Sequence, residues 1–177
     1  IIIMNKVFES LSMSKTPFIF ASSQMVGIPD SVYGSLKKMG EILTSTVGGI
    51  SARLWNVYGE EDLGLRSHVI TDFIHMAYKE GSIKMMTTGV EVRDFLHVHD
   101  CASALVTLSK NFKKFRGQVI DVASFEYTSI LELAKLISSK FNCPLEIGIA
   151  EDEIQKFHKF DPRKDLLDYW KPNIELE

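Results

Sequence analysis

Short apolar segments of β-strand type alternate along this chain with longer segments of helical periodicity. Strands are predicted at residues 18–22, 50–59, 83–86, 118–123 and 145–149, and helices at residues 5–15, 31–47, 67–81, 99–112 and 128–141. Single helices between successive strands are typical of parallel β-sheets. The order of elements therefore predicts an α/β fold with a largely parallel sheet.

Two of the predicted helices carry capping signals at their ends. Asp30 or Ser31 can cap the start of one helix, which should end at the glycine pair 48–49. A Thr or Ser cap opens the helix at residues 128–141, in which apolar residues recur at helical spacing. Both helices are therefore predicted from the signals at their ends as well as from their periodicity.

Composition and charge exclude several classes of protein. The 177 residues are 45% hydrophobic and 24% charged, which is ordinary for a globular domain. The net charge of −3 favours neither nucleic acid nor an anionic membrane as a partner. No apolar run approaches the roughly 20 residues that a membrane span needs. Cys101 and Cys143 lie outside any Cys-x-x-Cys pattern, which indicates free thiols and a cytoplasmic location.

The stretch "FIFASSQMVGIPDSVYGSLKKMGE", residues 18–41, combines residues suited to proton transfer. Tyr33 and Lys37 are four residues apart, so a helix places them on one face, about 5–6 Å apart at Cβ. A free Tyr has a pKa of about 10 and needs a nearby positive charge to act as a base near neutral pH. Ser23 follows a predicted strand and can hydrogen-bond the reacting hydroxyl.

Taken alone, the Tyr-x-x-x-Lys pattern is weak. In the alternative interpretation, Tyr33 packs at a helix–helix contact and Lys37 is solvated. The neighbouring segments favour the catalytic interpretation. The Ser pair, the Tyr-x-x-x-Lys-x-x-x-Glu pattern, "RLWNVYG" and "VRDFLHVHD" form an ordered series.

This series resembles the extended short-chain dehydrogenase/reductase family, in particular its NAD-dependent nucleotide-sugar epimerases and dehydratases. The family patterns are Ser-Ser-x-x-Val-Tyr-Gly, Tyr-Gly-x-x-Lys-x-x-x-Glu, Arg-x-x-Asn-x-Tyr-Gly and Arg-Asp-Phe-x-x-Val-x-Asp. The tail "FDPRKDLLDYWKPNIELE" is similar to the family's closing segment. The resemblance implies the C-terminal part of a doubly wound Rossmann-type parallel sheet plus a smaller α/β substrate-binding region.

The resemblance assigns roles around the cofactor. Tyr33 matches the catalytic acid/base, Lys37 the lysine that holds the nicotinamide ribose, and Ser23 their Ser partner. Ser22 is the less favoured choice for the Ser partner. Ser22 and Trp55, together with Tyr33 and Lys37, are expected to contact the cofactor, which is NAD or NADP.

The resemblance also assigns two residues to a nucleotide-diphosphate sugar. Asn56 matches the Asn that contacts the diphospho-sugar, and its alternative role is turn geometry before a glycine. Arg93 matches the Arg that binds the diphosphate, and it can also pair with Asp94 or Asp100. Asp100 is interpreted as structural.

One further arginine and two histidines are not assigned to the cofactor or to the substrate. Arg53 is interpreted as a buried partner of a carboxylate. His97 and His99 alternate on an extended segment without further spaced ligands, so we expect no metal site.

Departures from the family pattern disfavour some of the reactions that the family catalyses. The dehydratases carry an Asp-Glu pair after the Ser or Thr, and this chain has Gln24-Met25 there. Water elimination then lacks its acid and base, which disfavours a 4,6-dehydratase. The segment "AEDEIQKFHKF", residues 150–160, is acidic and lacks the second phosphate-binding Arg of the family.

The glycine-rich turn that binds the cofactor pyrophosphate has no counterpart here, so we expect a piece of a longer enzyme with an open sheet edge. Residues 1–60 are assigned to the dinucleotide-binding domain. Residues 61–177 are assigned mainly to substrate binding, with some segments returning to the Rossmann sheet. The last helix of the family is also expected to be missing after Glu177.

The predicted function is that of an NAD(P)-dependent nucleotide-sugar epimerase-type oxidoreductase. Hydride leaves a sugar carbon transiently while Tyr33 takes the hydroxyl proton, and the fragment alone should be inactive. A nucleotide-sugar reductase or dehydratase, or a catalytically silent binding module, is the alternative. A homodimer through the helix that carries Tyr33 is implied by the resemblance.

Overall fold

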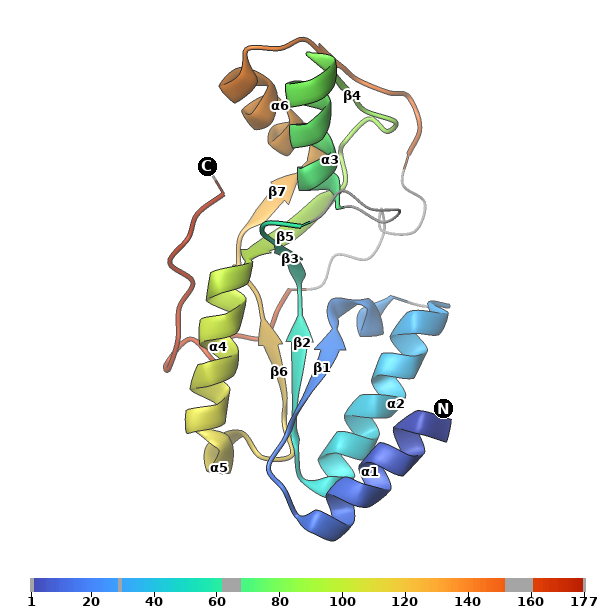
Figure 1. Ribbon diagram of the computed structural model, residues 1–177, viewed down its shortest axis with the longest axis vertical. Helices are drawn as coiled ribbons and strands as arrows, with labels where there is room; N and C mark the ends of the chain where they lie inside the picture. Colours follow the sequence, from blue (N-terminus) through green and yellow to red (C-terminus); the bar gives the residue numbers. More distant parts are fainter. Residues whose placement is uncertain (1, 29, 62–67, 152–160, 177) are drawn as a thin grey trace.

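The structure is a computed structural model that describes residues 2–28, 30–61, 68–151 and 161–176 (Figure 1). Its helices are α1 (Ile2–Ser14), α2 (Val32–Val47), α3 (Val69–His75), α4 (Val98–Lys110), α5 (Phe112–Phe115) and α6 (Ile130–Phe141), with a 3₁₀ turn η1 (Gln24–Gly27) and a π-helical turn η2 (Met76–Glu80). Its strands are β1 (Ile19–Ser23), β2 (Ile50–Leu54), β3 (Asn56–Tyr58), β4 (Ile83–Lys84), β5 (Val92–His97), β6 (Val119–Val122), β7 (Tyr127–Ser129) and β8 (Leu145–Glu146).

Three of these strands form a fully parallel sheet in the order β1-β2-β6. Figure 1 shows α1 and α2 on one side of this sheet and α4 with α5 on the other. The predicted α/β class and the parallel sheet are therefore confirmed. Among the described residues β1 pairs with β2 alone, so β1 is an edge strand of this sheet.

The segment 50–59, predicted as a strand leading into a loop, does begin as a strand, but its second half forms a strand of another sheet instead of a loop. β2 ends at Leu54, and β3 begins at Asn56 in a second sheet with the order β3-β5-β7. Trp55 lies between them, 4% exposed, and its indole nitrogen donates to Asp121 at 3.0 Å. Two strands of the second sheet, β5 and β7, are not among the predicted elements.

The upper part of the molecule in Figure 1 contains α3, η2, α6 and the short parallel pair β4-β8. Its apolar core is built from α3, α6, β4 and β5, and includes Phe73, Ile83, Phe95 and Leu133. The division of the chain at residue 60 into two domains stays a prediction. None of the described helices is both long and apolar enough to cross a membrane.

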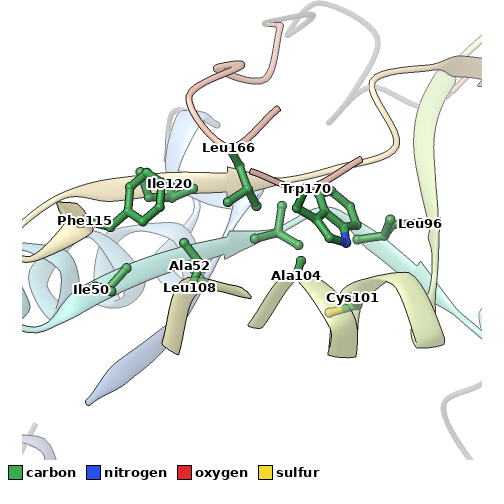
Figure 2. Packing of buried hydrophobic residues seen from close by; sticks show 11 residues of the cluster. Ile50, Ala52, Leu96, Cys101, Ala104, Leu108, Phe115, Ile120, Leu166 and Trp170 are labelled. Carbon is green, nitrogen blue, oxygen red and sulfur yellow. The ribbon is translucent and has the colours of Figure 1, made fainter. Parts of the chain in front are cut away.

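A separate apolar core lies between the parallel sheet and α4 (Figure 2). Strand residues such as Ile50 and Ile120 meet Leu108 of α4, and the tail adds Leu166 and Trp170. The tail is also held by polar contacts. Trp170 donates its indole N–H to the Ser103 hydroxyl at 2.7 Å.

Asp100 anchors the end of the tail and is structural, as expected. Its carboxylate is 4% exposed and accepts the backbone N–H groups of Asn173 and Ile174 at 2.9 and 2.8 Å. A buried carboxylate held by two donors avoids the cost of an unpaired charge.

The predicted helix ends are confirmed by their cap geometry. Ser31 caps α2 by accepting the backbone N–H of Gly34, and Gly48 ends the helix in the left-handed region at φ 87°. Ser129 and Glu132 form a complete capping box at the start of α6.

Candidate active site

The first turn of α2 lies directly against η1, and this contact brings Tyr33 near the carboxyl end of β1. A Cβ built on Gly34 would lie 2.1 Å from the carbonyl oxygen of Met25, so only glycine allows the approach. One turn and a half later, a Cβ on Gly40 would lie 2.2 Å from the ring of Phe20 on β1. Close packing at these two glycines sets the position of the helix over the strand.

Tyr33 and Lys37 lie on one face of α2, one turn apart. Tyr33 is 53% exposed, and the Lys37 ammonium lies 5.5 Å from its ring centroid. Lys37 also donates to the backbone carbonyl of Ala21 at 2.7 Å, and it lies 5.3 Å from the ring of Phe20. The ammonium is thus held at the edge of the sheet, next to an accessible phenol.

Ser23 is the last residue of β1 and caps η1. Its hydroxyl oxygen accepts the backbone N–H of Met25 at 3.2 Å, which leaves the hydroxyl hydrogen for another acceptor. The carboxyl ends of parallel strands are where ligands bind in open α/β sheets. The role of Ser23 as the partner of Tyr33 stays a prediction.

Ser22 points to the opposite face of β1 and takes part in an internal network. Its hydroxyl donates to Glu41 at 2.7 Å, and Arg53 donates to the same carboxylate at 2.6 and 2.9 Å. Arg53 thus has the carboxylate partner that was predicted for it. Burial alone would raise the pKa of Glu41, but hydrogen bonds from Arg53 and Ser22 outweigh burial and lower it.

Asn56 connects η1 to the second sheet. Its side-chain oxygen accepts from the Gln24 amide at 3.0 Å, and its nitrogen donates to the backbone carbonyl of Asp94 at 3.1 Å. The Asn56 amide keeps one further N–H that neither contact uses. Gln24, which stands where the dehydratases carry a carboxylate, therefore positions Asn56.

Arg93 lines a cavity of about 320 Å³ between α3, β4 and the start of β5. Its guanidinium donates to the backbone carbonyl of Val92 at 3.0 Å. The two carboxylates considered as its partners bind other groups: Asp94 accepts from Ser124 and Phe125, and Asp100 from the tail.

The other side chains of this cavity divide into a polar and an apolar set. Asp72, Lys84, Thr87 and Glu91 are polar, and the apolar set is Val69, Phe73, Met76, Met85, Met86 and Ile130. A cavity of this size with a largely apolar wall and few polar groups is typical of a small-molecule site. The acidic segment 150–160 lies outside the described residues except for Ala150 and Glu151.

His97 and His99 contact each other. The backbone N–H of His99 donates to Nδ1 of His97 at 3.2 Å, and the two rings meet edge to face. Across the described ranges, no group of three or more His, Cys, Asp or Glu residues is arranged to hold a metal.

Two residues that support the site have no role in the sequence-based assignment. Glu41 appears there only as part of the Tyr-x-x-x-Lys-x-x-x-Glu pattern, although it joins α2 to β1 and β2. Asp121 receives the indole N–H of Trp55 and, at 3.1 Å, the backbone N–H of Arg163. Asp121 stands between the apolar residues Ile120 and Val122, and Glu41 directly precedes the apolar pair Ile42-Leu43; this is the available signal for a buried carboxylate.

The sequence pattern of the NAD dependent epimerase/dehydratase family matches residues 1–123. The chain therefore belongs to this family of Rossmann-type proteins. Among curated relatives, it is 30% identical over 162 residues to dTDP-L-rhamnose 4-epimerase of Burkholderia thailandensis, covering 84% of this chain and 44% of that protein. It is 32% identical over 143 residues to GDP-L-fucose synthase of Sinorhizobium fredii, covering 72% of this chain and 43% of that protein. The chain thus spans less than half the length of these two relatives.

Solved structures show the same fold at low sequence identity. UDP-glucuronic acid 4-epimerase from Bacillus cereus, in complex with UDP-glucuronic acid and NAD, aligns with a TM-score of 0.84 at 20% identity. That alignment covers 99% of this chain and 62% of the other. WbmF from Bordetella bronchiseptica, in complex with NADH, aligns with a TM-score of 0.80 at 22% identity, covering 97% and 59%.

Proposed function

We propose that this chain carries the catalytic and sugar-nucleotide-binding part of an NAD(P)-dependent nucleotide-sugar epimerase-type oxidoreductase. The observation that carries the proposal is the accessible Tyr33 phenol beside the held Lys37 ammonium, at the carboxyl edge that ends in Ser23. Relatives named as 4-epimerases of dTDP-L-rhamnose and UDP-glucuronate support carbon 4 of the sugar as the reacting position.

The described residues fit one part of a nicotinamide cofactor. Lys37 offers an ammonium next to Tyr33 for a ribose hydroxyl, while the pyrophosphate turn is not among these residues. Ser22 and Trp55 remain proposed cofactor contacts through backbone atoms or a ring face, because their side-chain donors bind Glu41 and Asp121. When bound, the nicotinamide supplies reversible acceptance of a hydride.

The residues of the chain supply the proton transfer. The phenolate of Tyr33 takes the proton of the sugar hydroxyl and later returns it, a general-base step followed by a general-acid step. The Lys37 ammonium lies beside this proton acceptor, 5.5 Å from the centroid of its ring. Ser23 donates a hydrogen bond to the reacting oxygen and so orients it for the transfer.

Substrate binding is assigned to Arg93 and Asn56. Arg93 lines the 320 Å³ cavity, and a guanidinium matches a diphosphate with two parallel hydrogen bonds. The side-chain N–H of Asn56 that neither contact uses can donate a hydrogen bond to the diphospho-sugar. The amide of Gln24, bonded to Asn56, replaces the acid that a dehydratase needs, so this contact favours the epimerase over a dehydratase.

We also propose a cytoplasmic homodimer that pairs through α1 and α2. The free thiols of Cys101 and Cys143 fit a reducing compartment. Several apolar side chains on these two helices are exposed: Ile2, Ile3, Val7, Met13, Val32, Leu36 and Ile42. A second copy would remove this apolar surface from water.

The test of the function uses a nucleotide sugar labelled with deuterium at carbon 4. The chain, supplemented with the glycine-rich half of a relative and in excess over the labelled sugar, is mixed with NAD or NADP and denatured within a single turnover, before the hydride returns to the sugar, and the released nicotinamide is weighed by mass spectrometry. Deuterium on this transiently reduced nicotinamide, lost in Tyr33→Phe, supports the proposal. A chain that binds the nucleotide sugar but never transfers deuterium, even with the glycine-rich half of a relative added, is a silent binding module.

A further inference from the structure

The cavity beside Arg93 contains a buried carboxylate oxygen that lacks a partner. Glu91 lines this cavity, and its side chain is only 8% exposed. Its Oε1 accepts the hydroxyl of Thr87 at 2.7 Å, whereas its Oε2 has no hydrogen-bond partner. An unsatisfied buried carboxylate oxygen is costly, so a ligand that brings a hydrogen-bond donor is strongly favoured there.

The orientation of the Glu91 carboxylate is set by its neighbours. The hydroxyl oxygen of Thr87 accepts the backbone N–H of Gly89 at 3.2 Å, so its hydrogen is directed to Glu91 Oε1. The turn at Gly89, with φ +72°, is tied to α6 because Leu131 donates to the Gly89 carbonyl at 2.9 Å. The backbone carbonyl of Glu91 accepts from Ile130 at 3.0 Å. Both ends of this segment are therefore held, and Oε2 has a defined place.

Glu91 immediately precedes β5 and Arg93 is the second residue of that strand, and both side chains line the same cavity. Arg93 is the proposed diphosphate ligand. The cavity also has the charged side chains of Asp72 and Lys84, and its apolar wall includes Phe73 and three methionines. A flat base against this apolar wall would present its ring edge to the carboxylate. Uracil, thymine and guanine carry a ring N–H on that edge, whereas cytosine and adenine carry an acceptor nitrogen.

We propose that Glu91 selects the base of the nucleotide, accepting the ring N–H of uracil, thymine or guanine and rejecting cytosine and adenine. This inference rests on the proposed nucleotide-sugar function and extends it to the class of base. The preference follows because the ring nitrogen of cytosine or adenine is an acceptor that repels the carboxylate, so these bases can offer only the displaced exocyclic amino group in place of a ring N–H.

The test measures binding of UDP, CDP, GDP and ADP to the chain by titration calorimetry. Two pairs are compared: UDP with CDP, and GDP with ADP. In each pair, the nucleotide whose base carries a ring N–H is expected to bind roughly ten- to hundredfold more tightly, which is the value of one hydrogen bond to a charged group. In Glu91→Gln, Thr87 holds the amide oxygen, so the amide nitrogen takes the place of Oε2 and donates. The preference for UDP over CDP should then shrink or reverse.

Glu146→Gln is the matched control, since Glu146 is exposed on β8 and does not line the cavity. It should leave the order of affinities unchanged. Equal affinity of the wild-type chain for UDP and CDP overturns the inference and leaves the proposed function standing, and this comparison needs no variant. If Glu91→Gln lowers the affinity for all four nucleotides equally, Glu91 contacts the ribose, and the inference that Glu91 selects the base is also overturned. Failure of all four to bind overturns the nucleotide-sugar function itself.

Discussion

Glu41 of α2 accepts two hydrogen bonds from the guanidinium of Arg53 on β2, at 2.6 and 2.9 Å. The same carboxylate accepts the hydroxyl of Ser22 on β1, which lies opposite Arg53 in the register of the sheet. One side chain thus connects the helix that carries Tyr33 and Lys37 to two neighbouring strands.

Removing the charge of Glu41 should destabilise the fold. Glu41→Gln leaves the half-buried Arg53 without its ion-pair partner, so we expect a loss of about 3 kcal/mol in the free energy of unfolding. Urea denaturation followed by circular dichroism measures this loss. Lys38→Met removes an exposed partner of the same carboxylate at 3.4 Å and should cost less than about 1 kcal/mol. Equal losses in the two variants would contradict the structural role of the Arg53 contact.

The same contact predicts a loss of stability in acid. The pKa of Glu41 is lowered in the folded state, so the unfolded chain takes up the proton first as pH falls. The contribution is fully present above the ordinary value of 4.5 and is lost as pH falls through the lower folded pKa. Unfolding midpoints between pH 3 and pH 7 should therefore fall more steeply in the wild type than in Glu41→Gln. Parallel profiles would count against this assignment.

Tyr33→Phe should separate catalysis from folding. Tyr33 is 53% exposed, so its hydroxyl contributes little to stability, and the change should stay within about 0.5 kcal/mol. Deuterium transfer to the nicotinamide should fall by about 10²–10⁴-fold, because the proton acceptor is gone. Tyr78→Phe, at a tyrosine that is 70% exposed on η2, is the matched control and should keep full transfer. Transfer that survives in Tyr33→Phe would remove Tyr33 from the mechanism.

Gly34→Ala should displace the start of α2. The new Cβ would lie 2.1 Å from the Met25 carbonyl oxygen, so the helix or η1 must move, at a cost of about 1–3 kcal/mol. Ser35→Ala, one residue later on an exposed position, should be nearly neutral in the same denaturation experiment. A neutral Gly34→Ala would show that the contact with η1 yields easily.

Arg93→Met should lower the affinity of the chain for every nucleoside diphosphate to the same extent. A diphosphate contact is worth about 2 kcal/mol, or roughly a thirtyfold loss of affinity in calorimetry, whatever the base. Lys135→Met removes an exposed charge on α6 and should leave affinity unchanged. A loss confined to one base would mean that Arg93 reads the base rather than the phosphates.

Local signals in the sequence predict α2, the helix that carries Tyr33 and Lys37, well. Its cap at Ser31, its end at Gly48 and the spacing of Tyr33 and Lys37 all depend on residues within one or two turns. The resemblance to the family adds the class of enzyme, because the motifs recur in a fixed order. The identity of the carboxylate partner of Arg53 needs the crossing of α2 over the sheet, which no local signal provides.

The division of the extended segment at Trp55 could not be predicted from hydrophobic patterning. Residues on both sides of Trp55 read as one continuous strand, and the break depends on a partner, Asp121, that is 66 residues away. Likewise, the open Oε2 of Glu91 is visible only once Thr87 and the cavity are in place. Distant pairings of this kind carry no signature in a single sequence.

The tail that packs on α4 has a consequence for how the chain folds as it is synthesised. Leu166 and Trp170 complete the core between the parallel sheet and α4. The carboxylate of Asp100 accepts hydrogen bonds from backbone N–H groups that lie 73 and 74 residues further along the chain. Contacts across such long sequence separations form slowly, because the entropy of closing the loop is lost before the contact is gained. The core between the parallel sheet and α4 therefore stays accessible to chaperones and proteases until residues 166–174 have left the ribosome.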